Sequence, residues 1–403
     1  MNAYVQIDKR YQWGFFILCG GIFLFFPVLG IITATLFAIK TRSNQLILFM
    51  LWLLVMYFSA LNTTKVPAGD MEAYLDMFNS VPRNGYYRTL EYLSFNAAIV
   101  KDVGYASLVY LLYYIYGGNQ YLFIFTISVV TFLPFFMAIY KFGVEYEQPK
   151  YLIVAELLVI AFFSQYFSLT FHLVRQELAT SLFFYALTYR HSSIRNFIIW
   201  GIVAASIHSS IIAIIIIAII PFMTQELTMK EIVILVVGAL SFLFILSYFG
   251  SFLMDNYELE GSIEYGVSRM ADAEGAQDET KGSSSIVYVF SGLMVLLSVW
   301  EMFVNRGSVT YPLVVNLCFF WSVLVLGLFG SPLLQYRLFF IEYNFIPFII
   351  FLVFRNNPLL LKMVCFCLVI FLVFRFYSGL NKVFQYVSIE DAMTLSFISL
   401  IKI

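Results

Sequence analysis

The first residues that suggest chemistry lie in a polar stretch, Phe171-His-Leu-Val-Arg-Gln-Glu-Leu-Ala179, at the mouth of an otherwise apolar segment. A charge near the centre of a membrane span costs roughly 2.5 to 3.5 kcal/mol, so ionisable residues there usually line a pathway or a site. Four residues of the stretch have the spacing i, i+3, i+4 and i+7, which predicts one face of a helix: His172, Arg175, Gln176 and Ala179. We expect this face to present a guanidinium and two hydrogen-bonding groups to a cavity. The alternative is that Arg175 only neutralises Glu177 or meets an interfacial phosphate.

A second candidate begins at Gly69-Asp70, where Asp70, Tyr74 and Phe78 have the spacing i, i+4 and i+8. This pattern predicts a helix that begins just after Gly69, with the three side chains on one face. Capping of that helix by Asp70 is the alternative to a role in a site.

Two further ionisable residues lie in apolar runs. His208 is the only ionisable residue of the run 204–213, where it can transfer a proton or simply hydrogen bond to a neighbouring helix. Arg337 follows Pro332 at the start of another run. Because one guanidinium cannot balance the charge of a diphosphate, a second Arg at a span mouth suits such a ligand. The alternative is that Arg337 reaches the lipid headgroups.

The composition defines the elements that must position these residues. Of the 403 residues, 62% are hydrophobic and 12% are charged, and the mean hydropathy is +0.88. Soluble domains are about 45–50% apolar and about 25% charged, so the chain is predicted to be a polytopic integral membrane protein. The four cysteines lie in apolar runs, which indicates no disulfide framework and no metal site. We see no cleavable signal peptide.

Apolar runs long enough to span a bilayer predict about eleven transmembrane helices. They lie at about 14–39, 45–61, 119–140, 151–170, 172–190, 196–220, 230–250, 286–304, 310–330, 334–354 and 359–377. The apolar segment 104–116 is shorter and is expected to be a re-entrant or interfacial helix.

The whole chain, 1–403, is expected to form a single integral membrane domain with two hydrophilic loops. Residues 62–103, with the Gly-Asp pair, are predicted to be external, and the acidic loop 251–285 is more consistent with an external than a cytoplasmic position. The positive-inside rule predicts that the other loops, which carry Lys and Arg, are cytoplasmic. That prediction is compatible with two external loops only if one apolar run does not cross the membrane. The best candidate is 196–220, broken near His208, and the alternative is a cytoplasmic acidic loop.

No Gly-rich nucleotide loop, metal-spaced His/Cys cluster or nucleophilic Ser elbow occurs in the sequence. We therefore expect no metal, no cofactor and no nucleic-acid partner. No internal repeat of fixed period is visible, which weakens a transporter interpretation.

With these residues in place, the chain resembles the EpsG-like branch of the Wzy polysaccharide polymerases of the bacterial inner membrane. Four pieces carry the resemblance, and they cover residues 60–215 in order: Gly69-Asp70 with Tyr74 and Phe78, Lys101-Asp-Val-Gly-Tyr105, Arg175-Gln176 with Ala179, and His208 with Ser210. The fold expected is an all-α polytopic membrane protein, with a GT-C-like architecture as one option.

The resemblance implies a glycosyltransferase that moves a growing O-antigen, capsule or exopolysaccharide chain from undecaprenyl diphosphate onto a lipid-linked repeat unit. The site would face the periplasm or the outside. Arg175 and Arg337 are expected to hold the diphosphate, with Gln176 and Tyr74 as further substrate contacts. Asp70 is the first choice for the base, and His208 and His172 are the second. The expected partners are the lipid-linked oligosaccharide, the bilayer, and a chain-length regulator and flippase of the same pathway. The alternative function is a transporter or flippase of the lipid-linked oligosaccharide.

Overall fold

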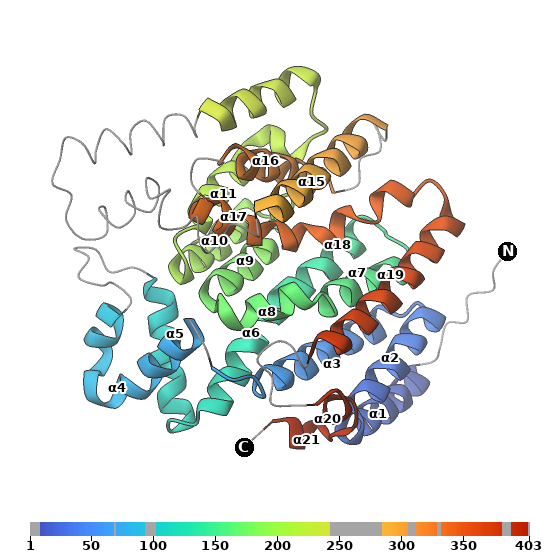
Figure 1. The fold of residues 1–403 in the computed structure, drawn as a ribbon. Helices are drawn as coiled ribbons and strands as arrows, with labels where there is room; N and C mark the ends of the chain where they lie inside the picture. Colours follow the sequence, from blue (N-terminus) through green and yellow to red (C-terminus); the bar gives the residue numbers. More distant parts are fainter. Residues whose placement is uncertain are drawn as a thin grey trace. The chain divides into compact units, whose positions relative to one another are not determined.

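The structure is a computed structural model that describes residues 9–67, 70–92, 102–241, 284–304, 311–328, 332–380 and 388–401. All regular elements in these ranges are helices (Figure 1). The expectation of an all-helical chain is therefore confirmed for the described residues. The acidic loop at 251–285 lies outside them, apart from its last two residues, so its predicted position is untested. Gly69 and Lys101 also lie outside the described residues.

The chain divides into two compact units, and the first contains both ends of the sequence. It comprises Met1–Tyr86, Gly104–His208 and Asn357–Ile403. Its helices, some of which continue past the limits of the unit, are α1 (Lys9–Phe25), α2 (Pro27–Thr41), α3 (Asn44–Asn62), α4 (Asp70–Tyr92), α5 (Val103–Tyr116), α6 (Gln120–Glu145), α7 (Lys150–Ala161), α8 (Ser164–His172), α9 (Val174–Leu187), α10 (Ile194–Ile207), α19 (Pro358–Gly379), α20 (Ile389–Thr394) and α21 (Phe397–Leu400).

The core of this first unit forms around α3, which packs against α2, α6 and α7. Phe58 of α3 is fully buried, and its ring lies against four aromatic rings from outside α3 at centroid distances of 5.3 to 6.2 Å. These rings belong to Phe132, Phe162, Phe167 and Phe376. Edge contacts of this kind add about 0.5–1.5 kcal/mol each beyond the burial of area. The aromatic core therefore holds α8 and α19 in place against α3.

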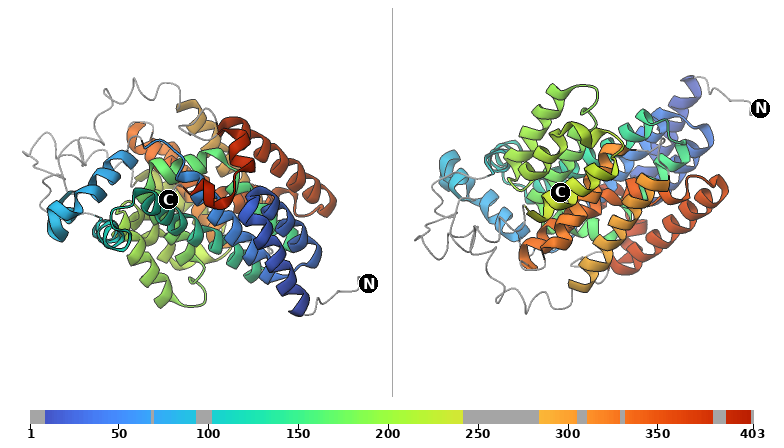
Figure 2. Two further views of the ribbon diagram at one scale, coloured as in Figure 1. Left: turned by 90° about the horizontal axis from the view of Figure 1, so that it is seen from below. Right: turned by 90° about the horizontal axis from the view of Figure 1, so that it is seen from above.

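The last described residues of the chain return to the first helices. Figure 2 shows α20 and α21 beside α1 and α2. The Tyr57 hydroxyl donates to the Ala392 carbonyl at 3.1 Å, and the Thr63 hydroxyl donates to the Leu400 carbonyl at 3.1 Å. Phe397 also packs on Phe23, with ring centroids 5.0 Å apart. The C-terminal segment is thus an integral part of the first unit.

The second unit comprises Tyr87–Val103 and Ser209–Asn356. Its buried polar contacts include an ion pair between Arg355 and Glu301 at 2.9 Å, and a hydrogen bond of 2.7 Å from Ser291 to the carboxylate of Glu342. The elements are α11 (Ile211–Ile219), η1 (Pro221–Thr224), α15 (Ser284–Val304), α16 (Pro312–Gly327), α17 (Pro332–Glu342), η2 (Tyr343–Phe345), α18 (Ile346–Ile349) and η3 (Leu352–Phe354).

Five helical segments of the described residues are long and apolar enough to span a membrane, or six if the bent pair α7 and α8, which meet at 55°, forms one span. They are Asn44–Asn62, Gln120–Glu145, Ser285–Val304, Gln335–Phe354 and Pro358–Gly379. Shorter apolar helices add to these, so the chain is a polytopic membrane protein. The predicted total of about eleven crossings stays a prediction.

The first predicted span, 14–39, is wrong as a single helix. The structure breaks it at Phe26 into α1 and α2, which pack against each other. Proline cannot continue a helix from the preceding turn and restricts the residue before it, so Pro27 starts a new helix. Gly30 then lets the two backbones approach, because a Cβ there would lie 2.6 Å from Cα of Phe23.

The run 196–220 is broken where the sequence indicated. α10 ends at Ile207, His208 is extended with φ −152° and ψ 121°, and α11 begins at Ile211. The segment 104–116 likewise forms one short helix, α5. Whether either element crosses the bilayer stays a prediction.

Candidate functional site

Two helices of the first unit, α4 and α9, bring a cation, a phenol and a carboxylate into one line. Arg175 lies in the first turn of α9, and its Nε–H donates to the hydroxyl of Tyr74 at 2.8 Å. The Tyr74 hydroxyl donates in turn to Oδ2 of Asp70 at 3.3 Å. The guanidinium also lies 5.3 Å from the Tyr74 ring centroid. Arg175 and Asp70, which are 105 positions apart in the sequence, are thus only two hydrogen bonds apart in space.

The start of α4 explains why Asp70 and Tyr74 are held so well. α4 begins at Asp70, as the sequence predicted, and the i, i+4, i+8 spacing turns Tyr74 and Phe78 inward, where both are buried. The ring of Phe78 stacks on Phe123 of α6 at 4.4 Å, and that of Tyr74 lies 5.0 Å from Tyr105 of α5. Asp70 is exposed at the end of this packed face. The carboxylate is therefore accessible, while the phenol that orients it is fixed.

The electrostatics of the line keep Tyr74 protonated. Burial raises the pKa of Tyr74 to about 12; the Arg175 guanidinium opposes this rise, and the Asp70 carboxylate adds to it. A phenol with this pKa stays a donor to Asp70 at neutral pH.

The predicted helix face across residues 172–179 is wrong. α8 ends at His172, Leu173 leaves helical geometry with φ −118° and ψ 48°, and α9 starts at Val174. His172 therefore does not share a continuous helix face with Arg175 and Gln176. No Gly or Pro marks the break, and the end of α8 is instead held by contacts from α3 and the segment after it. Such irregular backbone is tolerated at membrane depth where protein surrounds it.

Lys65 supplies one of these contacts, and we did not select it from the sequence. It follows α3, is 2% exposed, and donates from Nζ to the Phe167 carbonyl of α8 at 2.9 Å. The ammonium also lies 3.5 Å from the Phe167 ring centroid and 5.1 Å from that of Phe171. Burial lowers the pKa of Lys65 well below its ordinary value. Lys65 thus ties the segment that leads to Asp70 to the helix that precedes Arg175.

Tyr105 is a second residue that the sequence analysis did not assign, although it ends one of the four motif pieces. It is fully buried, and among the described residues its hydroxyl has no hydrogen-bond partner. An unpaired buried hydroxyl costs about 1–3 kcal/mol.

The other predicted residues lie nearby in sequence or elsewhere in the fold. His172 is half-buried at the end of α8, and Gln176 is buried in the first turn of α9. His208 is half-buried at the break after α10. Arg337 is exposed on α17 of the second unit. The roles of these four residues, and the pairing of the two guanidinium groups, stay predictions.

Two of the motif pieces also meet within the second unit. The backbone N–H of Ser209, next to His208, donates to Oδ1 of Asp102 at 3.2 Å. Among the described residues, no group of three or more His, Cys, Asp or Glu side chains is arranged to hold a metal ion.

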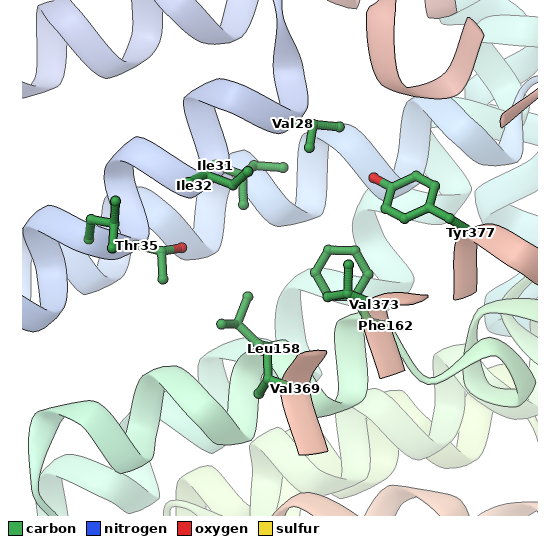
Figure 3. A pocket seen from close by; sticks show the side chains of 10 residues that line it. Val28, Ile31, Ile32, Thr35, Leu158, Phe162, Val369, Val373 and Tyr377 are labelled. Carbon is green, nitrogen blue, oxygen red and sulfur yellow. The ribbon is translucent and has the colours of Figure 1, made fainter. Parts of the chain in front are cut away.

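An apolar groove opens in the first unit between α2, α7 and α19 (Figure 3). It contains about 650 Å³ of empty space, part of it open to the outside. Its walls are aliphatic apart from Phe162 and two hydroxyl-bearing side chains, Thr35 and Tyr377. The Tyr377 hydroxyl is hydrogen bonded to that of Tyr57 at 2.8 Å. The groove therefore suits a hydrocarbon chain.

The fold and the site together define a membrane protein with a guanidinium and a carboxylate at one site. The chain belongs to the EpsG family, whose model matches residues 45–388. This match confirms the resemblance drawn from the sequence. The family is glycosyltransferase-like, and membership in it supports a role of the polysaccharide polymerase type. No curated protein and no solved structure matches the chain.

Proposed function

We propose that the chain is a polymerase that transfers a growing glycan from undecaprenyl diphosphate onto a lipid-linked oligosaccharide repeat unit. We place the reaction at the external face of a bacterial inner membrane. The observation that supports this best is the line from Arg175 through Tyr74 to Asp70. It holds a fixed cation and an accessible carboxylate two hydrogen bonds apart.

The reaction needs both groups. A hydroxyl oxygen of the acceptor sugar forms a bond to the anomeric carbon of the donor, and the bond from that carbon to the diphosphate oxygen breaks. The diphosphate leaves with the electron pair, and its charge is stabilised by a preorganised guanidinium. The proton of the acceptor hydroxyl passes to a carboxylate. We assign the first role to Arg175 and the second to Asp70.

Tyr74 is the positioning residue between them. Its protonated hydroxyl accepts from Arg175 and donates to Asp70, so it orients both groups before substrate arrives. Gln176 is a further contact to the substrate in this proposal, and His172 and His208 are the alternative bases. Arg337 is proposed as the second cation for the diphosphate.

The carrier lipid fits the groove of Figure 3. A polyprenyl tail is purely apolar, and the groove is lined by side chains such as Val28, Ile31 and Val373 on helices that are apolar enough to lie in a bilayer. The proposal does not need a metal ion or a cofactor. The other proposed partners are a chain-length regulator and a flippase that supplies the units.

The decisive experiment uses purified protein in liposomes with a defined undecaprenyl-diphosphate-linked repeat unit. Wild-type protein should give a ladder of chain lengths, with or without a chelator. Arg175→Lys keeps the charge but loses the planar fork, so it should leave single units unjoined. Arg83→Lys, an exposed Arg of α4, is the matched control and should give a normal ladder.

A normal ladder from Arg175→Lys would remove Arg175 from the diphosphate site. The same liposomes separate the polymerase from a flippase. If labelled units cross the membrane but are never joined, the chain is a transporter and the proposed function is wrong.

A further inference from the structure

Three tyrosines of α4 and α5 form a row of rings at the surface of the first unit. The centroids of Tyr86 and Tyr110 are 5.1 Å apart, with the rings at 72°, and those of Tyr110 and Tyr114 are 5.0 Å apart, at 58°. Tyr114 is 60% exposed and Tyr86 is 37% exposed. We call these three residues the tyrosine platform.

The backbone is shaped to build the tyrosine platform. Gly85, inside α4, has φ 65° and ψ −176°, a region that essentially only glycine adopts. A Cβ at Gly85 would meet nothing within 4 Å, so space does not explain the glycine. Its conformation instead interrupts the helix directly before Tyr86. The Tyr86 hydroxyl is then hydrogen bonded to that of Ser107 in α5 at 3.0 Å.

α5 connects the tyrosine platform to the candidate site. Tyr105 lies on Tyr74 at one end of this helix, and Tyr110 and Tyr114 follow five and nine residues later. At the rise of an α-helix, these separations are about 8 and 13 Å. α4 and α5 contact each other through aromatic rings, with the ring of Phe78 5.3 Å from that of Tyr113. At 3.6 residues per turn, Tyr110 and Tyr114 lie on the side of α5 away from Tyr105, so a polymer that leaves the site reaches the platform by passing around α5.

The surface around the tyrosine platform is amphipathic. α4 carries exposed charged side chains, among them Glu72 and Asp76, whereas α5 has no charged residue and exposes Leu111 and Ile115 beside Tyr114. Next to the rings, the Gln120 amide donates to Asn79 at 3.0 Å, and both groups are exposed. Tyrosine offers an apolar ring face and a hydroxyl together. That combination matches a sugar ring, which has a C–H face and a rim of hydroxyl groups.

We propose that the tyrosine platform binds the growing glycan after it leaves the site, so that successive units are added before the chain is released. This inference rests on the proposed function. It assigns a second contact for the substrate, separate from Arg175, Tyr74 and Asp70.

The test compares Tyr86→Ala/Tyr114→Ala with wild type and with Tyr121→Ala. Tyr121 is 44% exposed on α6, outside the platform, and is the matched control. The probe is the polymer that the wild-type protein makes, released from its lipid by mild acid. The double variant should bind it roughly tenfold more weakly, the loss of about one aromatic contact. It should also make shorter chains, at an unchanged rate of the first addition.

The outcomes separate this inference from the proposed function. If the double variant matches Tyr121→Ala in both binding and chain length, the tyrosine platform does not hold glycan. If it binds glycan normally but inserts poorly into liposomes, the rings serve lipid headgroups, and the inference is wrong. If the wild-type protein joins no units at all, the proposed function fails first and the platform with it.

Discussion

Replacing Tyr74 with Phe removes the hydroxyl that links Arg175 to Asp70 and keeps the ring that packs on Tyr105. A hydrogen bond to a charged group contributes about 1.5–3 kcal/mol. If the contact with Arg175 at 2.8 Å orients the guanidinium for catalysis, its loss raises the barrier by about 2 kcal/mol. This corresponds to a decrease of roughly 30-fold in kcat/KM. The contact with Asp70 is longer, at 3.3 Å, and we expect it to add little.

The assay is the rate of the first addition between two labelled lipid-linked units, measured from pH 6 to 9. Because the pKa of Tyr74 is about 12, above the ordinary value of 10, the phenol stays protonated throughout this range. The wild-type and variant profiles should therefore be parallel and differ only in height. Any stability that the protonated phenol contributes is present below about pH 10 and is lost as the pH rises through about 12.

Tyr116→Phe is the matched control, because it removes a hydroxyl that is bonded to Thr126 at 2.7 Å in another part of α5 and α6. Tyr116→Phe should lose about 1 kcal/mol of stability, and Tyr74→Phe about 2 kcal/mol, because the Tyr74 hydroxyl bonds charged groups. Only Tyr74→Phe should lose activity. Equal rates in the two variants would show that the line through Tyr74 is structural, and the proposed roles of Arg175 and Asp70 would lose their main support.

Three further predictions test the packing of the two units, each by itself. Lys65→Met removes a buried amine whose pKa is lowered by burial. Deprotonation of this amine favours the folded state. The melting temperature of wild type should therefore rise between pH 7 and pH 10 by more than that of the variant. Arg355→Met leaves the Glu301 carboxylate without its described cation and should destabilise the protein by about 3 kcal/mol, with Glu301→Gln restoring most of the loss in thermal unfolding. Gly30→Ala forces a methyl group against Phe23 and should cost about 1–3 kcal/mol in the same measurement.

Several local features of the site were predictable because they depend on spacing and composition. The start of α4 at Asp70 follows from a helical pattern that begins at that residue, and the same pattern turns Tyr74 inward. The break at His208 was predictable because the distribution of Lys and Arg among the loops requires that one apolar run does not cross the membrane. The short α5 follows from the length of its apolar run. Each of these signals is contained in a few neighbouring residues.

The join between α8 and α9 was not predictable in this way. Leu173 carries no Gly or Pro signal, and the ammonium that takes the carbonyl of Phe167 comes from Lys65, 102 positions earlier. Burial of Lys65 likewise depends on rings that reach it only in the folded chain. Contacts between distant parts of the sequence thus override the local helical pattern around Arg175.

The return of α20 and α21 to the first helices constrains how the protein is made. Tyr57 and Thr63 are synthesised early, but the carbonyl groups that they bond, at Ala392 and Leu400, are synthesised more than three hundred residues later. The first unit therefore stays incompletely packed while these residues are synthesised. This differs from most domains, which fold as units in the order of synthesis. During that interval the unfinished surface around α3 is exposed to chaperones and proteases of membrane-protein quality control.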